Sequence, residues 1–497
     1  MPEEKTSLRS GPQPGRWALS HLEIRTIVLG LSLAMFLAAL NQTIVATALP
    51  TIGRDLRNFE ALPWVVTAYL LTSTAVAPLY GKLSDIHGRR AMMLASIGIF
   101  IAGSAACAVA RDMIMLILGR GLQGVGGGGI LPLAQAILAD AVAPRERGRY
   151  QAYMGTVWVT AGLAGPLLGG ILAEHFHWSV IFWVNVPLGL VGAFMAHNSL
   201  RQLPRHERKH KLDLLGAGLM MAAAIPLLLA LTWGGTRYPW LSPQIGLLFL
   251  AACALAFLFT WRLLQASEPF LPLPVLGNQV MRMGSMCTSF SQGVIVGLTI
   301  YLPLYYEVVH KFSASDSGLG LIPIIVMSTP GSIVAGRALM YLDHYKRIPI
   351  IGLLFSIACL SALVWNPALS PITVAALLSV VAFGIGTTYP VGTVSIQNAV
   401  SRYQVGAAMG AMNFFRGLTA AFIVAVMGAI VLAAIGIAPQ RGSATIVTAT
   451  AKASGVDLAH VFRGIFALSV LCLIISLIAL IRMEQRPMRG RSEPAGG

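Results

Sequence analysis

Long apolar runs separated by short polar segments make up most of this chain of 497 residues. Each run is close to 20 residues, the length that an α-helix needs to cross the hydrocarbon core of a bilayer. The pattern predicts an all-α polytopic membrane protein. The fourteen predicted spans lie at 24–49, 62–81, 91–110, 113–139, 150–173, 180–197, 213–233, 244–264, 280–304, 317–337, 348–366, 371–391, 404–435 and 460–482.

A basic segment at 198–212 divides these spans. Six spans precede it, two follow it, and six more complete the chain. This order predicts two six-helix bundles with two inserted linker helices: an N-terminal bundle at 1–200, the linker helices at 201–270, and a C-terminal bundle with a basic tail at 271–497. A faint echo of an earlier polar stretch follows the tenth span and suggests a duplication. It consists of Gly336, Arg337, Asp343, Lys346 and Arg347.

Composition excludes a soluble domain, because 56% of the residues are hydrophobic, only 11% are charged, and the mean hydropathy is +0.74. The net charge of +16 would suggest nucleic acid as a partner of a soluble protein. Here the cations lie between apolar runs, so they are interpreted as topology signals and no nucleic-acid partner is expected. Placing both termini in the cytoplasm puts roughly 25 of the 35 Lys and Arg residues inside and about seven outside. The segment at 436–459 is then expected outside.

Cysteine and histidine positions argue against a metal site or an embedded enzyme. All five cysteines fall inside apolar runs without ligand spacing, which indicates packing residues. An enzyme would need a cluster of His, Asp or Cys at one depth, whereas the histidines lie mainly between spans. Residues 1–23 lack the apolar core of a cleavable signal peptide. We therefore expect no enzyme activity, no metal and no cofactor.

The stretch GKLSDIHGRR, residues 81–90, contains one acid among several cations. A short cytoplasmic loop would account for the cations alone. Gly81 allows two helices to approach closely, and Gly88 allows a sharp turn. Asp85, with Arg89 and Arg90 beside it, could accept hydrogen bonds from the N-terminus of a neighbouring helix. The second interpretation is thus a conformational latch on the cytoplasmic face.

Two polar patches lie at matching depth in the first and fourth spans. Asn41, Gln42 and Thr43 occur in LNQTIVATALP, and Arg120 and Gln123 occur in RGLQGVGGGG. Counting at 1.5 Å per residue places Asn41 and Arg120 roughly 12–14 Å inside the outer surface. Hydrogen bonding between helices and a structural arginine are the plain interpretations. The functional one is a polar site facing the interior or a wet cavity.

The fifth span contains GLAGPLLGG, in which small residues surround a proline. We expect one small-residue face and a bend that shapes a cavity; ordinary tight packing is the alternative. The residues are Gly162, Gly165, Pro166, Gly169 and Gly170.

Another buried cation, Arg416, lies near the middle of the thirteenth span, and Asn413 shares its helix face. Asp and Glu occur only at span ends. A cavity between the spans is therefore expected to be net positive, from Arg120 and Arg416, which favours an anionic or zwitterionic amphiphile over a simple cationic dye.

These segments, in this order, resemble the major facilitator superfamily and its fourteen-helix drug:proton antiporter branch (EmrB/QacA-like). The similarity extends to YLPLYYEVVHKFSASDSGLGLIP (301–323) and NFFRGLTAAF (413–422) and covers nearly the whole chain. The resemblance implies a secondary active exporter that moves amphipathic, drug-like molecules out of the cell by alternating access. It further implies proton antiport, the cytoplasmic (inner) membrane of a bacterium, and a periplasmic adaptor as a candidate partner. A lipid or anionic-amphiphile flippase of the same fold is the rival function.

One residue departs from the pattern that the resemblance implies. An acid is expected at position 41, paired with Arg120 as the proton carrier, but the chain has Asn41, which cannot titrate. Either coupling uses another site, or Asn41 is an inactivating change, natural or introduced. Glu307, where Gln is commoner in the branch, is a candidate replacement; a solvated charge at the rim is the other interpretation.

Overall fold

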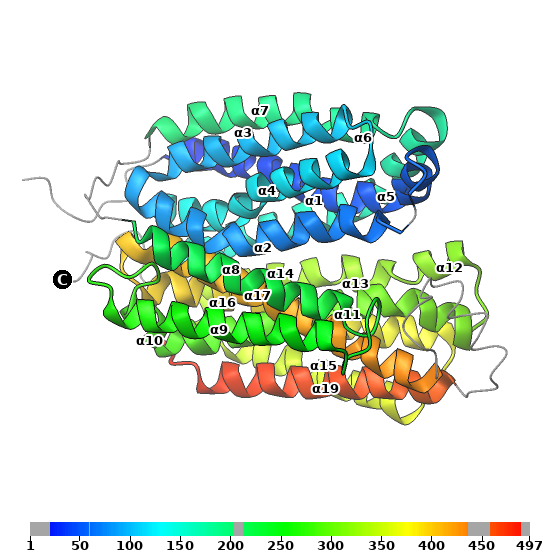
Figure 1. Cartoon of the computed structure of the whole chain (residues 1–497). Helices are drawn as coiled ribbons and strands as arrows, with labels where there is room; N and C mark the ends of the chain where they lie inside the picture. The colour runs from blue at the N-terminus through cyan, green and yellow to red at the C-terminus, as the bar shows by residue number, and fades with distance from the viewer. Residues whose placement is uncertain (1–19, 59, 203–211, 436–457, 489–497) are drawn as a thin grey trace, which may run out of the picture.

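The structure is a computed structural model that describes residues 20–58, 60–202, 212–435 and 458–488. Within these ranges, fourteen helices or groups of consecutive helices are long and apolar enough to cross a membrane. The predicted all-α fold with fourteen spans is therefore confirmed (Figure 1). Helices suit this setting because they satisfy their backbone hydrogen bonds internally where no water is present.

The helices fall into three consecutive groups. The first contains α1 (His21–Asp55), α2 (Leu62–His87), α3 (Arg89–Ala108), α4 (Met113–Ala141), α5 (Pro144–His175), α6 (Val180–Trp183), α7 (Asn185–Ser199) and the short η1 (Leu200–Gln202). The second contains α8 (Leu214–Trp233) and α9 (Pro243–Gln265). The third contains α10 (Leu273–Gly277), α11 (Gln279–Val309), α12 (Ala314–Leu319), α13 (Ile322–Val326), α14 (Ser328–Tyr341), α15 (Arg347–Trp365), α16 (Pro371–Ala399), η2 (Arg402–Gln404), α17 (Val405–Ile435) and α19 (Leu458–Arg482).

The first and third groups lie side by side with their long helices roughly parallel, and we call them the two halves (Figure 1). α8 packs against α2 of the first half and α17 of the second, while α9 packs against α8. The boundaries proposed at residues 200 and 270 stay predictions.

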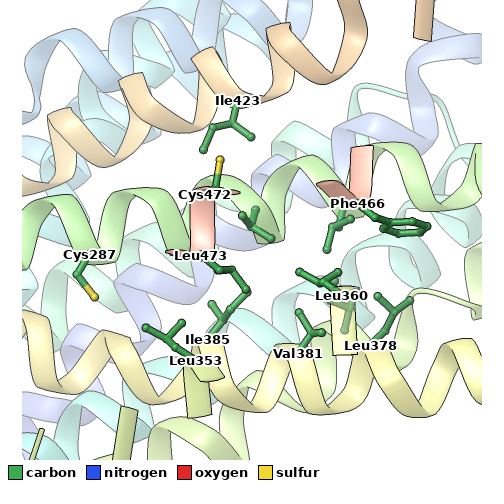
Figure 2. Packing of buried hydrophobic residues seen from close by; sticks show 14 of the residues in the cluster. Cys287, Leu353, Leu360, Leu378, Val381, Ile385, Ile423, Phe466, Cys472 and Leu473 are labelled. Atoms are coloured by element: carbon green, nitrogen blue, oxygen red, sulfur yellow. The ribbon is translucent and has the colours of Figure 1, made fainter. Parts of the chain in front are cut away.

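Each half is held together by its own apolar interior. In the second half, side chains of α11, α15, α16, α17 and α19 form one buried cluster (Figure 2). Cys287 and Cys472 belong to this cluster, and every cysteine of the chain is free. In the first half, the glycines of α4 bring neighbouring backbones close. A Cβ on Gly126 would lie 2.6 Å from Cα of Phe100 in α3, and one on Gly128 would lie 2.7 Å from Cα of Ser73 in α2.

The structure corrects some span limits. α1 continues through Pro50 to Asp55, and α2 continues to His87. The stretch 81–90 is therefore not a loop: only Gly88, with φ of 89°, separates α2 from α3. The residues up to His87 form the C-terminal end of α2, and Arg89 and Arg90 begin α3. The segments 203–211, 436–457 and both chain ends lie outside the described residues, so the predicted membrane orientation stays a prediction.

Candidate functional site

A cavity of about 720 Å³ lies between the two halves. At one end it reaches Ala77 in α2 and Gln135 toward the C-terminal end of α4. At the other end it reaches Thr67 near the start of α2 and Leu432 near the end of α17. Its wall is mainly apolar, and the volume suits a drug-sized molecule. The aromatic residues of the lining are Tyr69, Trp158, Tyr301 and Tyr389. We call the end of the molecule at residues 81–90 the glycine end, and the other the far end.

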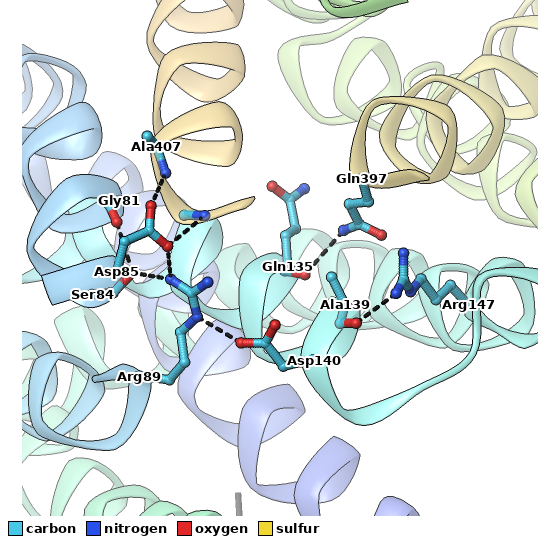
Figure 3. A network of polar contacts seen from close by, with 11 residues as sticks. Gly81, Ser84, Asp85, Arg89, Gln135, Ala139, Asp140, Arg147, Gln397 and Ala407 are labelled. Atoms are coloured by element: carbon cyan, nitrogen blue, oxygen red, sulfur yellow. Dashed lines mark hydrogen bonds and ion pairs between the residues drawn. The ribbon is translucent and has the colours of Figure 1, made fainter. Parts of the chain in front are cut away.

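At the glycine end, Asp85 joins the two halves (Figure 3). Its Oδ1 accepts a hydrogen bond from the backbone N of Gly406 at 3.0 Å, and Oδ2 accepts one from Ala407 at 2.8 Å. Both donors lie in the first turn of α17, where a helix favours negative charge. Arg89 binds Asp85 at 2.6 Å and Asp140 of α4 at 2.8 Å. The contact expected between the acid and a helix N-terminus is thus present, and its role as a latch stays a prediction.

The other residues of this stretch also find partners. Gly81 packs directly on Gly406: a Cβ at either residue would overlap the carbonyl oxygen of the other. The Arg90 guanidinium contacts the ring of His197 in α7 at 2.9 Å. Gly81 therefore performs the close helix approach that its sequence position predicts, while Arg90 stays within the first half.

A second contact of the same kind joins α5 to α14. A Cβ on Gly148 would lie 2.7 Å from the carbonyl oxygen of Gly336. Near it, Arg145 and Asp343 form an exposed ion pair at 3.5 Å. Gly336 and Asp343 belong to the weak echo noted in the sequence. Gly148 was missed, because it precedes the predicted fifth span in a polar segment and has no motif of its own.

Polar side chains form hydrogen bonds between the halves at the end of the cavity nearest the glycine end. Asn413 of α17 donates from Nδ2 to Oε1 of Gln135 in α4 at 2.7 Å. Gln397 of α16 donates from Nε2 to the carbonyl oxygen of Gln135 at 2.9 Å (Figure 3). Together with the glycine contacts, these bonds close the cavity toward the glycine end.

Asn41 and Arg120 lie in the interior of the first half, and Gln123 connects them. Asn41 Oδ1 accepts from Nε2 of Gln123 at 3.0 Å and from Nδ2 of Asn185 at 3.2 Å. Arg120 donates from Nη1 to Oε1 of Gln123 at 2.5 Å and from Nε to the carbonyl oxygen of Val65 at 2.8 Å. The two residues therefore share a network, as their depth suggested, but through an intervening amide.

This network does not belong to the cavity wall. Asn41, Arg120 and Gln123 are all buried and none of them lines the cavity. Tyr69 separates them from it: the tyrosine lines the cavity, and the Arg120 guanidinium lies 4.5 Å from its ring centroid. Gln42, next in sequence, does line the cavity. The expectation that Arg120 contributes charge to the cavity surface is wrong, because an aromatic ring covers it.

The glycines of α5 do not share one face. Cβ atoms built at Gly165 and Gly169 would overlap Thr43 and Thr47 of α1, and Thr43 donates to the carbonyl oxygen of Ala161 at 3.0 Å. A Cβ on Gly162 would instead meet Ile325 of α13 at 3.5 Å, and one on Gly170 would have no neighbour within 4 Å. Gly170 follows Gly169 by one residue, so helical rotation turns it away. Pro166 lies inside α5 as expected.

Arg416 and Glu307 occupy different surroundings in the second half. Arg416 lines the cavity, and its guanidinium lies 5.6 Å from the ring centroid of Tyr389. Glu307 is half-buried near the C-terminal end of α11 and does not line the cavity.

Asn185 and Tyr69, which complete the polar network and its boundary, were missed by the sequence analysis. Both are isolated in apolar runs. A single amide in a membrane span was the one available signal for Asn185, since such groups seek partners on other helices.

Comparisons with known proteins agree with this architecture. The family described as Major Facilitator Superfamily matches residues 31–424. The chain is 32% identical to Multidrug transporter protein MdtP of Bacillus subtilis over 82% of this chain and 76% of that protein. It is 34% identical to Efflux pump FUS6 of Gibberella moniliformis, over 72% and 65% of the two chains.

A solved structure supports the fold alone. The human organic anion transporter MFSD10 superposes with a TM-score of 0.63 at 17% identity, covering 90% of this chain and 99% of that one. With the family match, the relatives and the fourteen spans, the chain belongs to the major facilitator superfamily and is a multi-pass membrane transporter rather than an enzyme.

Proposed function

We propose that this transporter exports amphipathic small molecules by alternating access. The observation that carries the proposal is the cavity of about 720 Å³, which has apolar walls and is closed at the glycine end by contacts between the halves. Relatives named as a multidrug transporter and an efflux pump support drug-like substrates. In the proposed cycle the Asp85 and glycine contacts separate while the far end closes. The proposed setting is a bacterial inner membrane with both termini cytoplasmic, and a periplasmic adaptor is a candidate partner.

The family resemblance implies a proton gradient as the energy source, and we infer that position 41 does not couple this chain to that gradient. Asn41 accepts two hydrogen bonds from neutral amides, and its own Nδ2 has no partner among the described residues. An amide does not ionise near neutral pH, so this network cannot switch an ion pair with Arg120. The chain as written should couple weakly or not at all at this site.

Flux measurements in liposomes test both proposals. Three pyrene amphiphiles that differ only in their polar group (a butyrate, its methyl ester and a trimethylammonium analogue) are followed with and without an imposed pH gradient. At least one probe should move, and the gradient should change its rate little. Asn41→Asp should introduce a pH-dependent rate, because a carboxylate beside Gln123 can titrate and attract Arg120.

Asn366→Asp is the matched control, because Asn366 is exposed at the end of α15. It should leave the rate unchanged. If no probe moves, the export proposal fails. Strong gradient-driven flux that Asn41→Asp leaves unchanged would show that position 41 is not the coupling site in either form. Glu307 would then be the next residue to test.

Lipid transport is a second candidate function, favoured by the positive charge of Arg416 in an otherwise uncharged cavity wall. A phospholipid such as phosphatidylglycerol presents an anionic head group and apolar chains, which match the chemistry of the wall.

A further inference from the structure

Arg416 is the only charged side chain among the described residues that line the cavity. The rest of that lining is apolar, aromatic, or neutral and polar. Because low-dielectric walls focus the field of a charge, one unopposed guanidinium sets the sign of the potential that a bound molecule experiences.

The guanidinium is poorly satisfied by the protein itself. Its Nε and Nη2 are buried and have no hydrogen-bond partner within the described part of the chain. The ring of Tyr389 lies beside it, with 5.6 Å between the guanidinium carbon and the ring centroid. Arg120 differs, since its Nε and Nη1 both donate to buried oxygens. A buried charge that lacks hydrogen-bond partners is costly, because nothing compensates for the water that it has lost.

A bound anion would supply what Arg416 lacks. Carboxylate, sulfonate and phosphate oxygens match the planar fork of a guanidinium and form charge-assisted hydrogen bonds with it. The apolar remainder of the same molecule would contact the apolar wall and its aromatic side chains, such as Trp158 and Tyr301. A cation in this cavity would meet repulsion from Arg416 and no acid to offset it.

We propose that Arg416 binds the anionic group of an amphipathic substrate and so makes the transporter selective for organic anions. This inference rests on the proposed export function and specifies its substrate class. The shared chemistry is a single anionic group on an apolar body, whether it comes from a free organic acid or from the head group of an anionic lipid.

The test is binding and liposome flux of the three pyrene probes with the full chain. The butyrate should bind about tenfold more tightly than the trimethylammonium analogue, with the ester between them. Arg416→Gln keeps a hydrogen-bonding side chain without the charge, and it should abolish this preference by weakening butyrate binding and by relieving the repulsion of the trimethylammonium analogue. Arg416→Lys should keep most of the preference. Arg282→Gln, an exposed change at the start of α11, is the control.

The outcomes separate the two proposals. If the ester and the cation are transported and the butyrate is not preferred, anion selectivity is overturned while export stands. If Arg416→Gln leaves the preference intact, Arg416 is not the binding residue and the proposal is overturned. If the unmodified chain transports none of the three probes, both the export proposal and the anion-selectivity proposal are overturned.

A competition arm identifies the source of the anion. Pyrenebutyrate is challenged with dihexanoyl phosphatidylglycerol, which is anionic, and with dihexanoyl phosphatidylcholine, which is zwitterionic. Displacement by the first lipid and not by the second supports anion selectivity with a lipid head group as the ligand. Failure of both lipids to displace a tightly bound pyrenebutyrate supports a free organic acid.

Discussion

The two halves meet along two seams at the glycine end, and the seams differ in their charges. Between α2 and α17, Gly81 packs on Gly406 beside Asp85, whose side chain is 6% exposed. Between α5 and α14, Gly148 packs on Gly336 beside Asp343, whose side chain is 88% exposed. The backbone contact therefore repeats, while among the described residues the buried ion pair of Asp85 with Arg89 belongs to the first seam alone.

This difference distinguishes two roles of the stretch 81–90: close contact between helices, and a buried ion pair. Glycine allows the helices to touch, and it does so equally in both seams because no Cβ keeps the backbones apart. The buried ion pair adds specificity to one seam: Asp85 requires both Arg89 and the amides of α17. We expect closure of the glycine end to depend on the glycine contacts of both seams. We expect buried charge to influence this closure through the seam between α2 and α17.

The largest effect should come from filling the glycine contacts. Gly81→Leu and Gly336→Leu place a side chain against backbone and should destabilise the closed arrangement by about 3 kcal/mol each, the upper end for overpacking. Spin labels across each seam would report a longer distance. Gly98→Leu, where a Cβ has no neighbour within 4 Å, is the control. Unchanged distances in both variants would show that the seams accommodate side chains by local adjustment.

A smaller effect should follow from removing the buried charge. Asp85→Asn keeps the shape but weakens the hydrogen bonds to α17 and removes one of the two carboxylates that pair with Arg89, at a cost of about 2 kcal/mol. The midpoint of thermal unfolding in detergent should fall, and most transport should be lost. Wild-type transport by this variant would reduce the stretch to a topology signal.

The smallest effect should come from the exposed pair. Asp343→Asn, the matched change in the other seam, should alter stability by less than about 0.5 kcal/mol, because solvent and salt screen the contact with Arg145. Transport should stay near the wild-type rate. An effect as large as that of Asp85→Asn would mean that the two seams carry equivalent charges after all.

Sequence reasoning predicted the fold well because fourteen apolar runs leave few alternatives. It also predicted that Asp85 contacts a helix N-terminus, since glycines beside a lone acid have a physical meaning. It could not identify α17 as the partner helix. Depth counting placed Asn41 and Arg120 at one level, but it could not reveal the rotation of each helix, which decides that Gln123 lies between them and that Tyr69 shields them from the cavity.

The inserted helix α8 gives the transporter two unlike flanks. It packs on both α2 and α17 and contributes Leu228, Leu231 and Thr232 to the cavity wall. On the other flank α5 meets α13 and α14, and neither α8 nor α9 packs against these helices. A molecule dissolved in the bilayer that approaches sideways therefore encounters an extra helix on one flank and only a helix-to-helix joint on the other. We therefore expect lateral access to the cavity to be directional, with the joint between α5 and α13 as its route.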